Sequence, residues 1–163
     1  MSAPRLTYCS VTNFLYVGDE FLFVLRDAKR KVDPNRLNGI GGKLEPGENY
    51  LDCAIRETLE ETGYVVTSAD VQLSGIARLE GGYNEDWVMA FFKIRVSTKE
   101  IPLGNHTDEG QLIWLPKDQA LTTDHEMVDD LKILFPLVVE GKQPFFFSAI
   151  MNDQEKIASY TLS

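Results

Sequence analysis

Three glutamates near the end of a predicted helix are the residues of this sequence best suited to chemistry. Glu57, Glu60 and Glu61 lie in the segment GGKLEPGENYLDCAIRETLEETG, residues 41–63. At 3.6 residues per turn, their carboxylates fall within an arc of about 100° on one side of the helix. Glu57 and Glu61 form a like-charge i,i+4 pair, and the carboxyl-terminal end of a helix disfavours anions. A divalent cation would relieve this repulsion, and carboxylate oxygens suit Mg²⁺ or Mn²⁺.

The helix that positions these glutamates is predicted over residues 49–62. Pro46-Gly47 breaks the chain before it, and Gly63 has the position usual for a glycine after the last helical turn. One stripe of this helix is predicted to face the core, with Leu59 at its edge: Leu51, Ala54, Ile55, Thr58 and Thr62. The three glutamates therefore lie beside the buried face.

The rest of the chain predicts a sheet and a second helix. Runs of β-branched and aromatic residues indicate a hairpin from residues 5–17 and 21–26, and further strands at 71–80, 87–96, 111–115, 144–151 and 157–162. The basic segment 27–37 is predicted to be a loop, and 38–42 a short extended piece. Residues 126–140 have helical spacing, with Pro136 marking a kink or a stop.

These elements predict an α+β fold in a single domain spanning residues 1–163. One mixed sheet is expected between the 49–62 helix and a carboxyl-terminal helix within about 124–140. The net charge of −9 argues against nonspecific binding to nucleic-acid polymers, because no basic stripe offsets it. Two bound Mg²⁺ ions would reverse the local field and admit a small anionic substrate. No membrane-spanning run or signal-peptide pattern is visible, so a cytoplasmic location is expected.

Other potential motifs are incomplete. The segment GIGGKL lacks residues that a P-loop or a dinucleotide fingerprint requires. His106 and His125 lack the spacing of a metal motif and are expected to be loop or cap residues. Cys9 and Cys53 are too few for a disulfide framework, and Cys53 is expected to be a small buried thiol.

The acidic segment has the spacing Gly-x5-Glu-x7-Arg-Glu-Thr-x-Glu-Glu-x-Gly-Tyr, made of Gly42, Glu48, Arg56, Glu57, Thr58, Glu60, Glu61, Gly63 and Tyr64. It resembles the Nudix box of the Nudix hydrolases, which cleave nucleoside diphosphates linked to another moiety. Thr58 and Tyr64 depart from this pattern, since both stand where the box has aliphatic residues. These are packing positions, so the departure concerns the seating of the helix more than the chemistry.

The resemblance extends to the MutT-like subgroup, which hydrolyses 8-oxo-dGTP and related oxidised purine triphosphates. It rests on LNGIGGKLEPGE (37–48), VLR (24–26), DEGQLIWLP (108–116) and the tail between residues 122 and 151. It implies release of a nucleoside monophosphate and pyrophosphate. Enzymes of this subgroup commonly carry a tryptophan before the acidic residue of the base pocket, but the matching stretch LTTDHE has none. The candidates for an aromatic wall are Phe14, Phe23, Tyr8 and Phe145.

The resemblance also implies roles for individual residues. Glu57, Glu60 and Glu61 would hold Mg²⁺, or Mn²⁺ in its place, with help from the Gly41 carbonyl. Glu109 matches a further metal-binding or water-activating glutamate, although it could equally be a loop glutamate. Arg56 would orient the carboxylates through Glu60 or Glu48.

The expected substrate contacts lie on both sides of the box. Arg26 and Lys43 are the best cations for phosphate, unless they are surface charges. The Asn38 amide offers a donor and an acceptor to a purine edge. Asp124 either faces the base, as the resemblance implies, or caps a helix beginning near His125. Trp114 is expected to pack in the core.

Three functions stay open. The first is a Mg²⁺-dependent pyrophosphatase of oxidised purine nucleoside triphosphates. The second is a Nudix hydrolase of another nucleotide, such as a dinucleoside polyphosphate, a nucleotide sugar or a capped RNA end. The third is a catalytically silent Nudix-fold binding module, against which the intact glutamates count.

Overall fold

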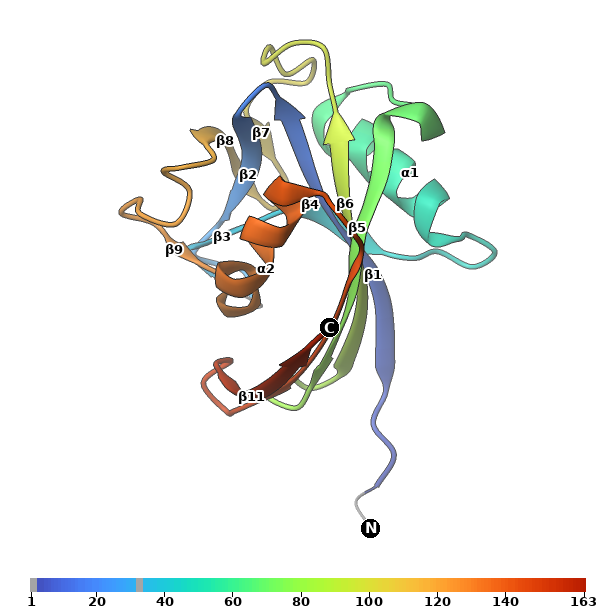
Figure 1. Ribbon diagram of the computed structural model, residues 1–163, viewed down its shortest axis with the longest axis vertical. Helices are drawn as coiled ribbons and strands as arrows, with labels where there is room; N and C mark the ends of the chain where they lie inside the picture. Colours follow the sequence, from blue (N-terminus) through green and yellow to red (C-terminus); the bar gives the residue numbers. More distant parts are fainter. Residues whose placement is uncertain (1–2, 32–33) are drawn as a thin grey trace.

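The computed structural model describes residues 3–31 and 34–163. This part of the chain forms two α-helices and a large β-sheet (Figure 1). The helices are α1 (Tyr50–Thr62) and α2 (Asp129–Glu140), and a 3₁₀ turn covers Ser68–Asp70. The strands are β1 (Thr7–Val17), β2 (Glu20–Arg26), β3 (Arg36–Asn38), β4 (Ile40–Lys43), β5 (Val71–Glu80), β6 (Asp86–Arg95), β7 (His106–Thr107), β8 (Gly110–Pro116), β9 (Glu126–Met127), β10 (Phe145–Met151) and β11 (Ile157–Leu162). Neither helix in this part of the chain is long and apolar enough to cross a membrane.

All the strands belong to one mixed sheet. Its main path runs in the order β11-β10-β5-β6-β1-β2-β3-β9, while β4 pairs with β1, and β8 pairs with β2 and β7. The pairs β1/β6, β5/β10 and β3/β9 are parallel, and the other pairs are antiparallel. Strand β4 pairs residue by residue with positions 10–13 of β1, which places Gly41 and Gly42 beside the centre of the sheet.

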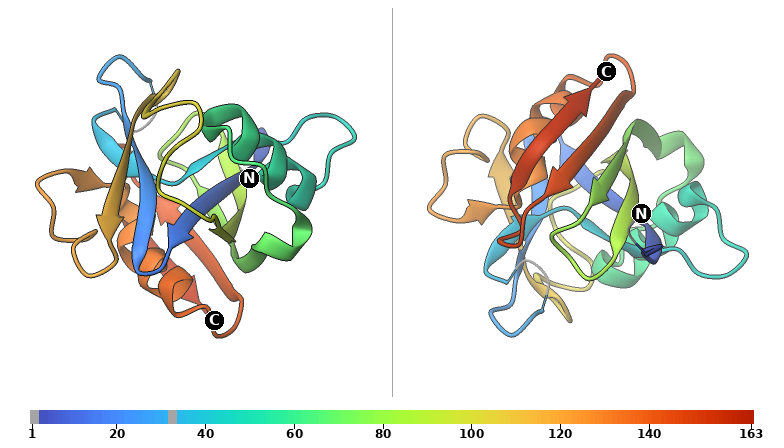
Figure 2. Two further views of the ribbon diagram at one scale, coloured as in Figure 1. Left: turned by 90° about the horizontal axis from the view of Figure 1, so that it is seen from above. Right: turned by 90° about the horizontal axis from the view of Figure 1, so that it is seen from below.

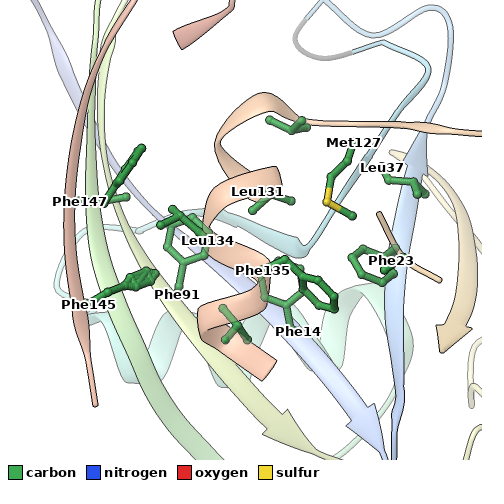
Figure 3. Close-up of a cluster of buried hydrophobic side chains, with 14 of the residues drawn as sticks. Phe14, Phe23, Leu37, Phe91, Met127, Leu131, Leu134, Phe135, Phe145 and Phe147 are labelled. Carbon is green, nitrogen blue, oxygen red and sulfur yellow. The ribbon is translucent and has the colours of Figure 1, made fainter. Parts of the chain in front are cut away.

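The two helices cover opposite faces of this sheet, as the sequence predicts. Ala54 and Cys53 of α1 pack against the Val11 and Leu15 side of β1. Leu134 and Phe135 of α2 pack against the other face, in a cluster that contains Phe14, Phe23, Phe91, Phe145 and Phe147 (Figure 3). The β10–β11 hairpin runs next to α2 in both views of Figure 2. The fold is therefore α+β, with the mixed sheet between the two helices.

Helix α1 begins and ends where the sequence predicts. The Asn49 side chain accepts a hydrogen bond from the backbone N–H of Asp52 at 2.9 Å and caps the first turn. Gly63 has a φ of 81°, and its N–H donates to the Leu59 carbonyl at 2.9 Å. A side chain at this left-handed position would be strained, so glycine ends the helix here.

Helix α2 differs from the prediction at its beginning. It starts at Asp129 rather than near residue 126, because Glu126 and Met127 pair as β9 with Arg36 and Leu37 of β3. The expected loop over 27–37 is accordingly wrong at 36–37. Pro136 does not end the helix, which continues to Glu140.

Thr58 and Tyr64, which stand where the sequence pattern has aliphatic residues, both form hydrogen bonds through their hydroxyl groups. The Asn13 side-chain amide, fully buried under α1, donates to the Ala54 carbonyl at 3.0 Å and to Thr58 Oγ1 at 3.2 Å. The Thr58 hydroxyl in turn donates to the Ala54 carbonyl at 2.8 Å. The Tyr64 hydroxyl donates to the Thr98 carbonyl at 2.6 Å. Thr58 thus provides an acceptor for one N–H of the buried Asn13 amide, which an aliphatic residue could not do.

We predict that Thr58→Val destabilises the protein by about 1–3 kcal/mol, because one buried N–H of Asn13 loses its acceptor. The same substitution in an Asn13→Leu background should be close to neutral, since both polar partners are then replaced by apolar groups. Urea unfolding of the two single variants and the double variant measures this coupling. A Thr58→Val protein as stable as the unsubstituted one would contradict the matched-pair interpretation.

Candidate active site

A cleft of about 690 Å³ opens where the glycine-rich strand β4 meets the sheet and both helices. Its walls include Thr12 of β1, Asn38 of β3, Trp87 of β6, Glu57 of α1 and Asp130 of α2. Most of the residues that the sequence singles out line this cleft, namely Arg26, Asn38, Gly41, Lys43, Arg56, Glu57 and Glu109. One cavity therefore joins the acidic helix to a polar pocket on the α2 side of the sheet.

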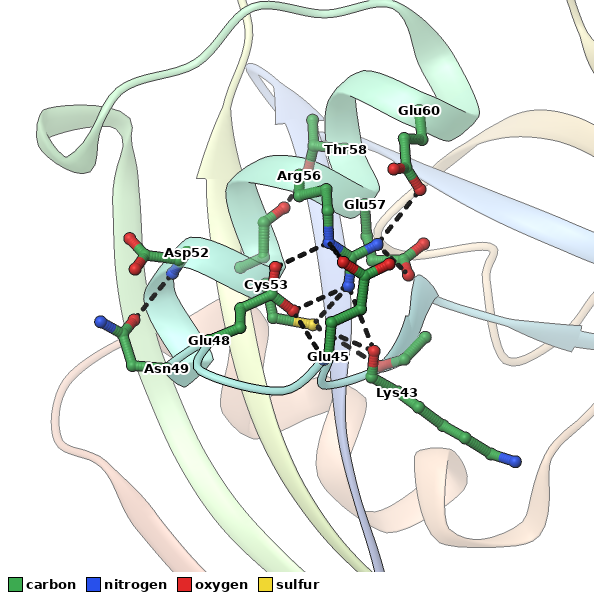
Figure 4. A network of polar contacts seen from close by, with 12 residues as sticks. Lys43, Glu45, Glu48, Asn49, Asp52, Cys53, Arg56, Glu57, Thr58 and Glu60 are labelled. Carbon is green, nitrogen blue, oxygen red and sulfur yellow. Dashed lines mark hydrogen bonds and ion pairs between the residues drawn. The ribbon is translucent and has the colours of Figure 1, made fainter.

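Arg56 lies at the centre of the acidic cluster (Figure 4). Its Nε and Nη2 donate to the two oxygens of Glu48 at 2.7 and 2.8 Å, a bidentate pair. Its Nη1 donates to Glu57 at 2.9 Å and to Glu60 at 3.1 Å. The hydrogen bonds from Arg56 lower the pKa of Glu48 to about 2. Arg56 therefore contacts both of its predicted partners, Glu48 and Glu60, and Glu57 as well.

The glycines of β4 bring backbone directly against these carboxylates. A Cβ added at Gly42 would collide with the Glu57 carboxylate, and one at Gly41 would collide with the Val11 carbonyl. Only glycine fits at position 41 while β4 keeps its pairing with β1, whereas a side chain at position 42 would displace the Glu57 carboxylate. The β4 backbone at Gly42 therefore lies directly beside the Glu57 carboxylate.

Glu61 is the least compensated of the three glutamates. Its Oε2 is buried and has no hydrogen-bond partner in the structure. Burial raises the pKa of Glu61 to about 9, and the charges of Glu109 and Glu57 add to this effect. Burial also raises the pKa of Glu57, although Arg56 opposes the shift. These carboxylates lie close enough to repel one another.

Glu109 lies in the cleft and is paired with arginines. Its Oε2 is 3.2 Å from Nη1 of Arg26, and its Oε1 is 3.8 Å from Nη2 of Arg30. The backbone carbonyl of Glu109 also accepts a hydrogen bond from Asp27 N–H at 2.9 Å. Arg26, which the sequence marks as a phosphate contact, is thus placed in the cleft beside Glu109, and Arg30 is a further cleft cation that sequence reasoning missed.

The donor set fits a hard divalent cation. Glu57, Glu60, Glu61 and Glu109 supply carboxylate oxygens, and the buried Oε2 of Glu61 has no other partner. Within residues 3–31 and 34–163, no three acidic, histidine or cysteine side chains converge on one point, because Glu57, Glu60 and Glu109 are turned toward arginines. Rotation of these exposed or half-buried carboxylates would bring oxygens to a cation, whose charge would offset their mutual repulsion.

Lys43 points away from the carboxylates, as Figure 4 shows. Its ammonium lies 3.7 Å from the ring centroid of Tyr8 and 5.6 Å from that of Trp87. The two rings are register partners on β1 and β6, with centroids 5.3 Å apart. A cation over aromatic faces is held by their quadrupoles. Lys43 thus remains in the cleft without neutralising the acidic cluster.

The aromatic wall of the cleft consists of Tyr8, Tyr83 and Trp87 among the described residues. Phe14, Phe23 and Phe145 are buried in the core on the α2 side and do not line the cleft. Of the four candidates that the sequence offers, only Tyr8 lies there. Trp87 was missed because a strand tryptophan gives no signal of the face to which it points.

The remaining candidates lie outside the cleft. Trp114 packs against the α1-side core, and its Nε1 donates to the Lys99 carbonyl at 2.9 Å. Cys53 is fully buried, as expected, and burial raises the pKa of its thiol to about 12. His125 lines a separate shallow hollow beside Leu121 and Thr123, and His106 lies in β7.

The structure does not bring Asp124 to the cleft. Asp124 is exposed and lines the same hollow as His125. It does not cap α2 either, because the helix begins at Asp129 and its cap position is Val128. The acidic residue of α2 that does line the cleft is Asp130, which is buried in the first turn of the helix. The adjacent pair Asp129-Asp130 would have pointed to it if the start of the helix had been placed correctly.

The raised pKa of Glu61 predicts how the stability of the cation-free protein depends on pH. Folded Glu61 keeps its proton up to about pH 9, whereas the unfolded chain releases it near pH 4.5. The folded state therefore binds the extra proton between these values, and stability falls as pH rises through that window, by up to about 1.4 kcal/mol per pH unit.

Glu61→Gln should flatten this dependence and raise the melting temperature of the chelator-treated protein at pH 8. Melting curves from pH 5 to 9 in EDTA, with and without the substitution, measure the effect. Exposed Asp52→Asn on the same helix is the control. If the melting temperatures of the Glu61→Gln and unsubstituted proteins change with pH in the same way, Glu61 is ionised in the folded state and its charge is offset by other groups.

Comparisons with known proteins agree with this geometry. The mouse protein described as oxidized purine nucleoside triphosphate hydrolase is 29% identical over 136 residues, covering 82% of this chain and 81% of that protein. The crystal structure of the mutator MutT protein from Bacillus halodurans superposes with a TM-score of 0.79 at 24% identity, covering 96% of this chain and 97% of that one. A NUDIX hydrolase from Nitrosomonas europaea gives a TM-score of 0.68 at 22% identity, covering 85% and 92%.

The family described as NUDIX domain matches residues 9–137, which contain most of β1, all of β2 to β9 and α1, and most of α2. This range includes the acidic helix, the glycine strand and the residues that line the cleft, Asp130 among them, apart from Tyr8. The chain therefore belongs to the Nudix family and is a hydrolase that acts on phosphoanhydride bonds.

Proposed function

We propose that this protein is a Mg²⁺-dependent pyrophosphatase of oxidised purine nucleoside triphosphates such as 8-oxo-dGTP. It would release the nucleoside monophosphate and pyrophosphate. The observation that carries this proposal is a single cleft that joins the Glu57 carboxylate of α1 to a pocket lined by Asn38 and Asp130. The name of the mouse relative, at 29% identity, supports the substrate class. A cytoplasmic location would suit a free nucleotide substrate.

The acidic side of the cleft would carry out the hydrolysis. Mg²⁺, or Mn²⁺ in its place, held by Glu57, Glu60, Glu61, Glu109 and the Gly41 carbonyl, would neutralise charge on the phosphoryl oxygens. The oxygen of water bonds to phosphorus, the anhydride P–O bond breaks toward pyrophosphate, and a carboxylate takes the proton of the water. Glu109, which lines the cleft opposite α1, is the carboxylate that we assign to this water.

The arginines and Lys43 would order the charges around the phosphates. Arg56 donates to Glu57 and Glu60 through its Nη1, so it compensates the charge of these carboxylates before the metal and the substrate arrive. Arg26 at the end of β2 and Arg30 in the loop that follows face the cleft beside Glu109. Lys43, placed on the Tyr8 ring, brings a third cation to the phosphates. Their charges compensate a triphosphate that an acidic chain would otherwise repel.

The opposite side of the cleft would recognise the base. The Asn38 side-chain oxygen accepts a hydrogen bond from the Gly39 N–H at 2.8 Å, which fixes the orientation of its amide. Asp130 is buried in the wall formed by α2. A purine edge that presents both a donor and an acceptor matches an amide and a carboxylate in one pocket. The ring itself would lie against Met89, Leu79 and the aromatic wall.

We predict that Glu57→Gln lowers kcat by more than about 100-fold, because it removes a carboxylate that would contact the metal directly. Release of pyrophosphate from a panel of nucleotides with Mg²⁺, Mn²⁺ or EDTA measures this effect. The panel includes 8-oxo-dGTP, dGTP, a dinucleoside polyphosphate and a nucleotide sugar. Exposed Asp52→Asn, on the same helix, is the matched control.

The panel separates the three functions. Preferential release of pyrophosphate from 8-oxo-dGTP supports the proposed substrate. Preferential hydrolysis of another nucleotide would show that this nucleotide is the substrate instead. If no nucleotide is hydrolysed with either metal, the protein is a binding module. Near-full turnover by the Glu57→Gln variant would remove Glu57 from the metal site.

We predict that Asp130→Asn lowers kcat/KM for 8-oxo-dGTP by about tenfold, since the loss of a buried charged hydrogen bond costs about 1.5–3 kcal/mol. Asp124→Asn should leave the same constant unchanged, because Asp124 lies outside the cleft. Steady-state kinetics of both variants on 8-oxo-dGTP and dGTP provide the comparison. If kcat/KM falls for Asp124→Asn and not for Asp130→Asn, Asp124 recognises the base and Asp130 does not.

A further inference from the structure

A group of charged contacts outside the cleft joins the turn between β10 and β11, residues 152–156, to the start of α2. Lys156, which directly precedes β11, has its Nζ 2.6 Å from Oε1 of Glu126 in β9. The Asp129 carboxylate accepts a hydrogen bond from the Ile157 backbone N–H at 2.8 Å. Arg36 of β3 lies between these elements, 3.9 Å from Glu126 and 3.7 Å from Glu155. Three segments that are distant in sequence therefore meet here.

The contact made by Asp129 is the most directional of the group. Its side chain is only partly exposed, and a hydrogen bond from a backbone N–H to a carboxylate is stronger than one between neutral groups. Asp129 is also the first residue of α2, where the helix dipole favours an anion. The bond joins the first turn of α2 to the beginning of β11.

The segments held in this way carry both proposed base contacts. Strands β3 and β9 form a short parallel pair, Arg36 with Glu126 and Leu37 with Met127, which continues with a 3.0 Å bond from Val128 N–H to the Leu37 carbonyl. Asn38 follows Leu37 directly, and Asp130 follows Asp129. A pair of this length forms few hydrogen bonds, so the separation of Asn38 and Asp130 depends on support from outside the pair.

We propose that Asp129 is a positioning residue for base recognition, acting through the β10–β11 turn. By anchoring the first turn of α2 to Ile157, it fixes the place of Asp130 relative to Asn38 across the cleft. This inference rests on the proposed function, in which those two side chains contact the base. Asp129 itself does not line the cleft.

The inference predicts a specific kinetic signature. The acidic residues that would hold the metal lie on α1 and before β8, and none of the contacts of Asp129 reaches them. A displaced Asp130 weakens base binding equally in the ground state and the transition state, which raises KM and leaves kcat unchanged. The loss of one such hydrogen bond corresponds to a roughly three- to tenfold change.

The experiment compares Asp129→Ala with Asp129→Asn, which keeps a side-chain oxygen for Ile157 N–H. Exposed Asp153→Ala, in the same turn, is the matched control. Asp129→Ala should raise KM for 8-oxo-dGTP three- to tenfold at constant kcat and reduce its preference over dGTP. Asp129→Asn and Asp153→Ala should stay within twofold of the unsubstituted protein. If Asp129→Ala fails to fold, Lys156→Met replaces it as the test. This substitution breaks the neighbouring contact with Glu126 and should also raise KM.

Hydrogen exchange at the Val128 amide tests the anchoring without a substrate. Asp129→Ala should accelerate this exchange, because the bond to the Leu37 carbonyl loses its support, while the Gly63 amide at the end of α1 should stay unchanged. Unchanged Val128 exchange would overturn the anchoring. Faster exchange with unchanged KM and base preference, or a lower melting temperature alone, would reduce Asp129 to a structural role. An unsubstituted protein without preference for a purine would refute the proposed function, and the exchange result would still decide the anchoring.

Discussion

The repulsion among the acidic side chains of α1 is the constraint on which the rest of the site depends. Glu57 and Glu61 stand one turn apart at the end of the helix with a raised pKa, and Arg56 is the nearest compensating cation of the helix itself. Such an arrangement is stable only if the remainder of the helix is firmly seated. Ala54, Cys53 and the Asn13–Thr58 pair bury the opposite face, and Gly63 ends the helix without strain. Packing on one face thus offsets electrostatic cost on the other.

The sheet connects this acidic helix to the α2 side of the cleft, because the side chains of β1 alternate between its two faces. Successive residues of β1 point to opposite faces, so Val11 and Leu15 pack under α1 while Phe14 packs under α2. Ser10 and Thr12, on the same face as Phe14, are left uncovered by α2 and line the cleft. Because β4 pairs with this part of β1, the glycine backbone and the uncovered residues share one rigid frame. The frame fixes the distance between the α1 side and the α2 side of the cleft.

The sequence predicts the parts of the molecule that local patterns determine. The spacing of Glu57, Glu60 and Glu61, the cap at Asn49 and the glycine at 63 are all signals within one helix, and the structure agrees at each boundary. The start of α2 was predicted wrongly because Glu126 and Met127 pair with residues about 90 positions earlier in the chain, which no local periodicity reports. Because of that error, the base contact was assigned to Asp124 and Asp130 was not considered. Pairing between distant segments decides which of several acidic residues reaches the cleft.

The same distant pairing explains how the cleft is built without the tryptophan common in MutT-like enzymes. Val128, which lines the cleft from α2, is too small to stack on a base, and the aromatic rings lie on the opposite wall, in β1 and β6. Tyr8 and Trp87 are register partners in a long parallel pair, so their positions are fixed by many backbone hydrogen bonds. A stacking surface in the sheet would not depend on the short β3–β9 pair. Under the proposed function, the α2 segment then supplies only polar contacts, whose directionality makes them the part of the pocket most sensitive to small shifts.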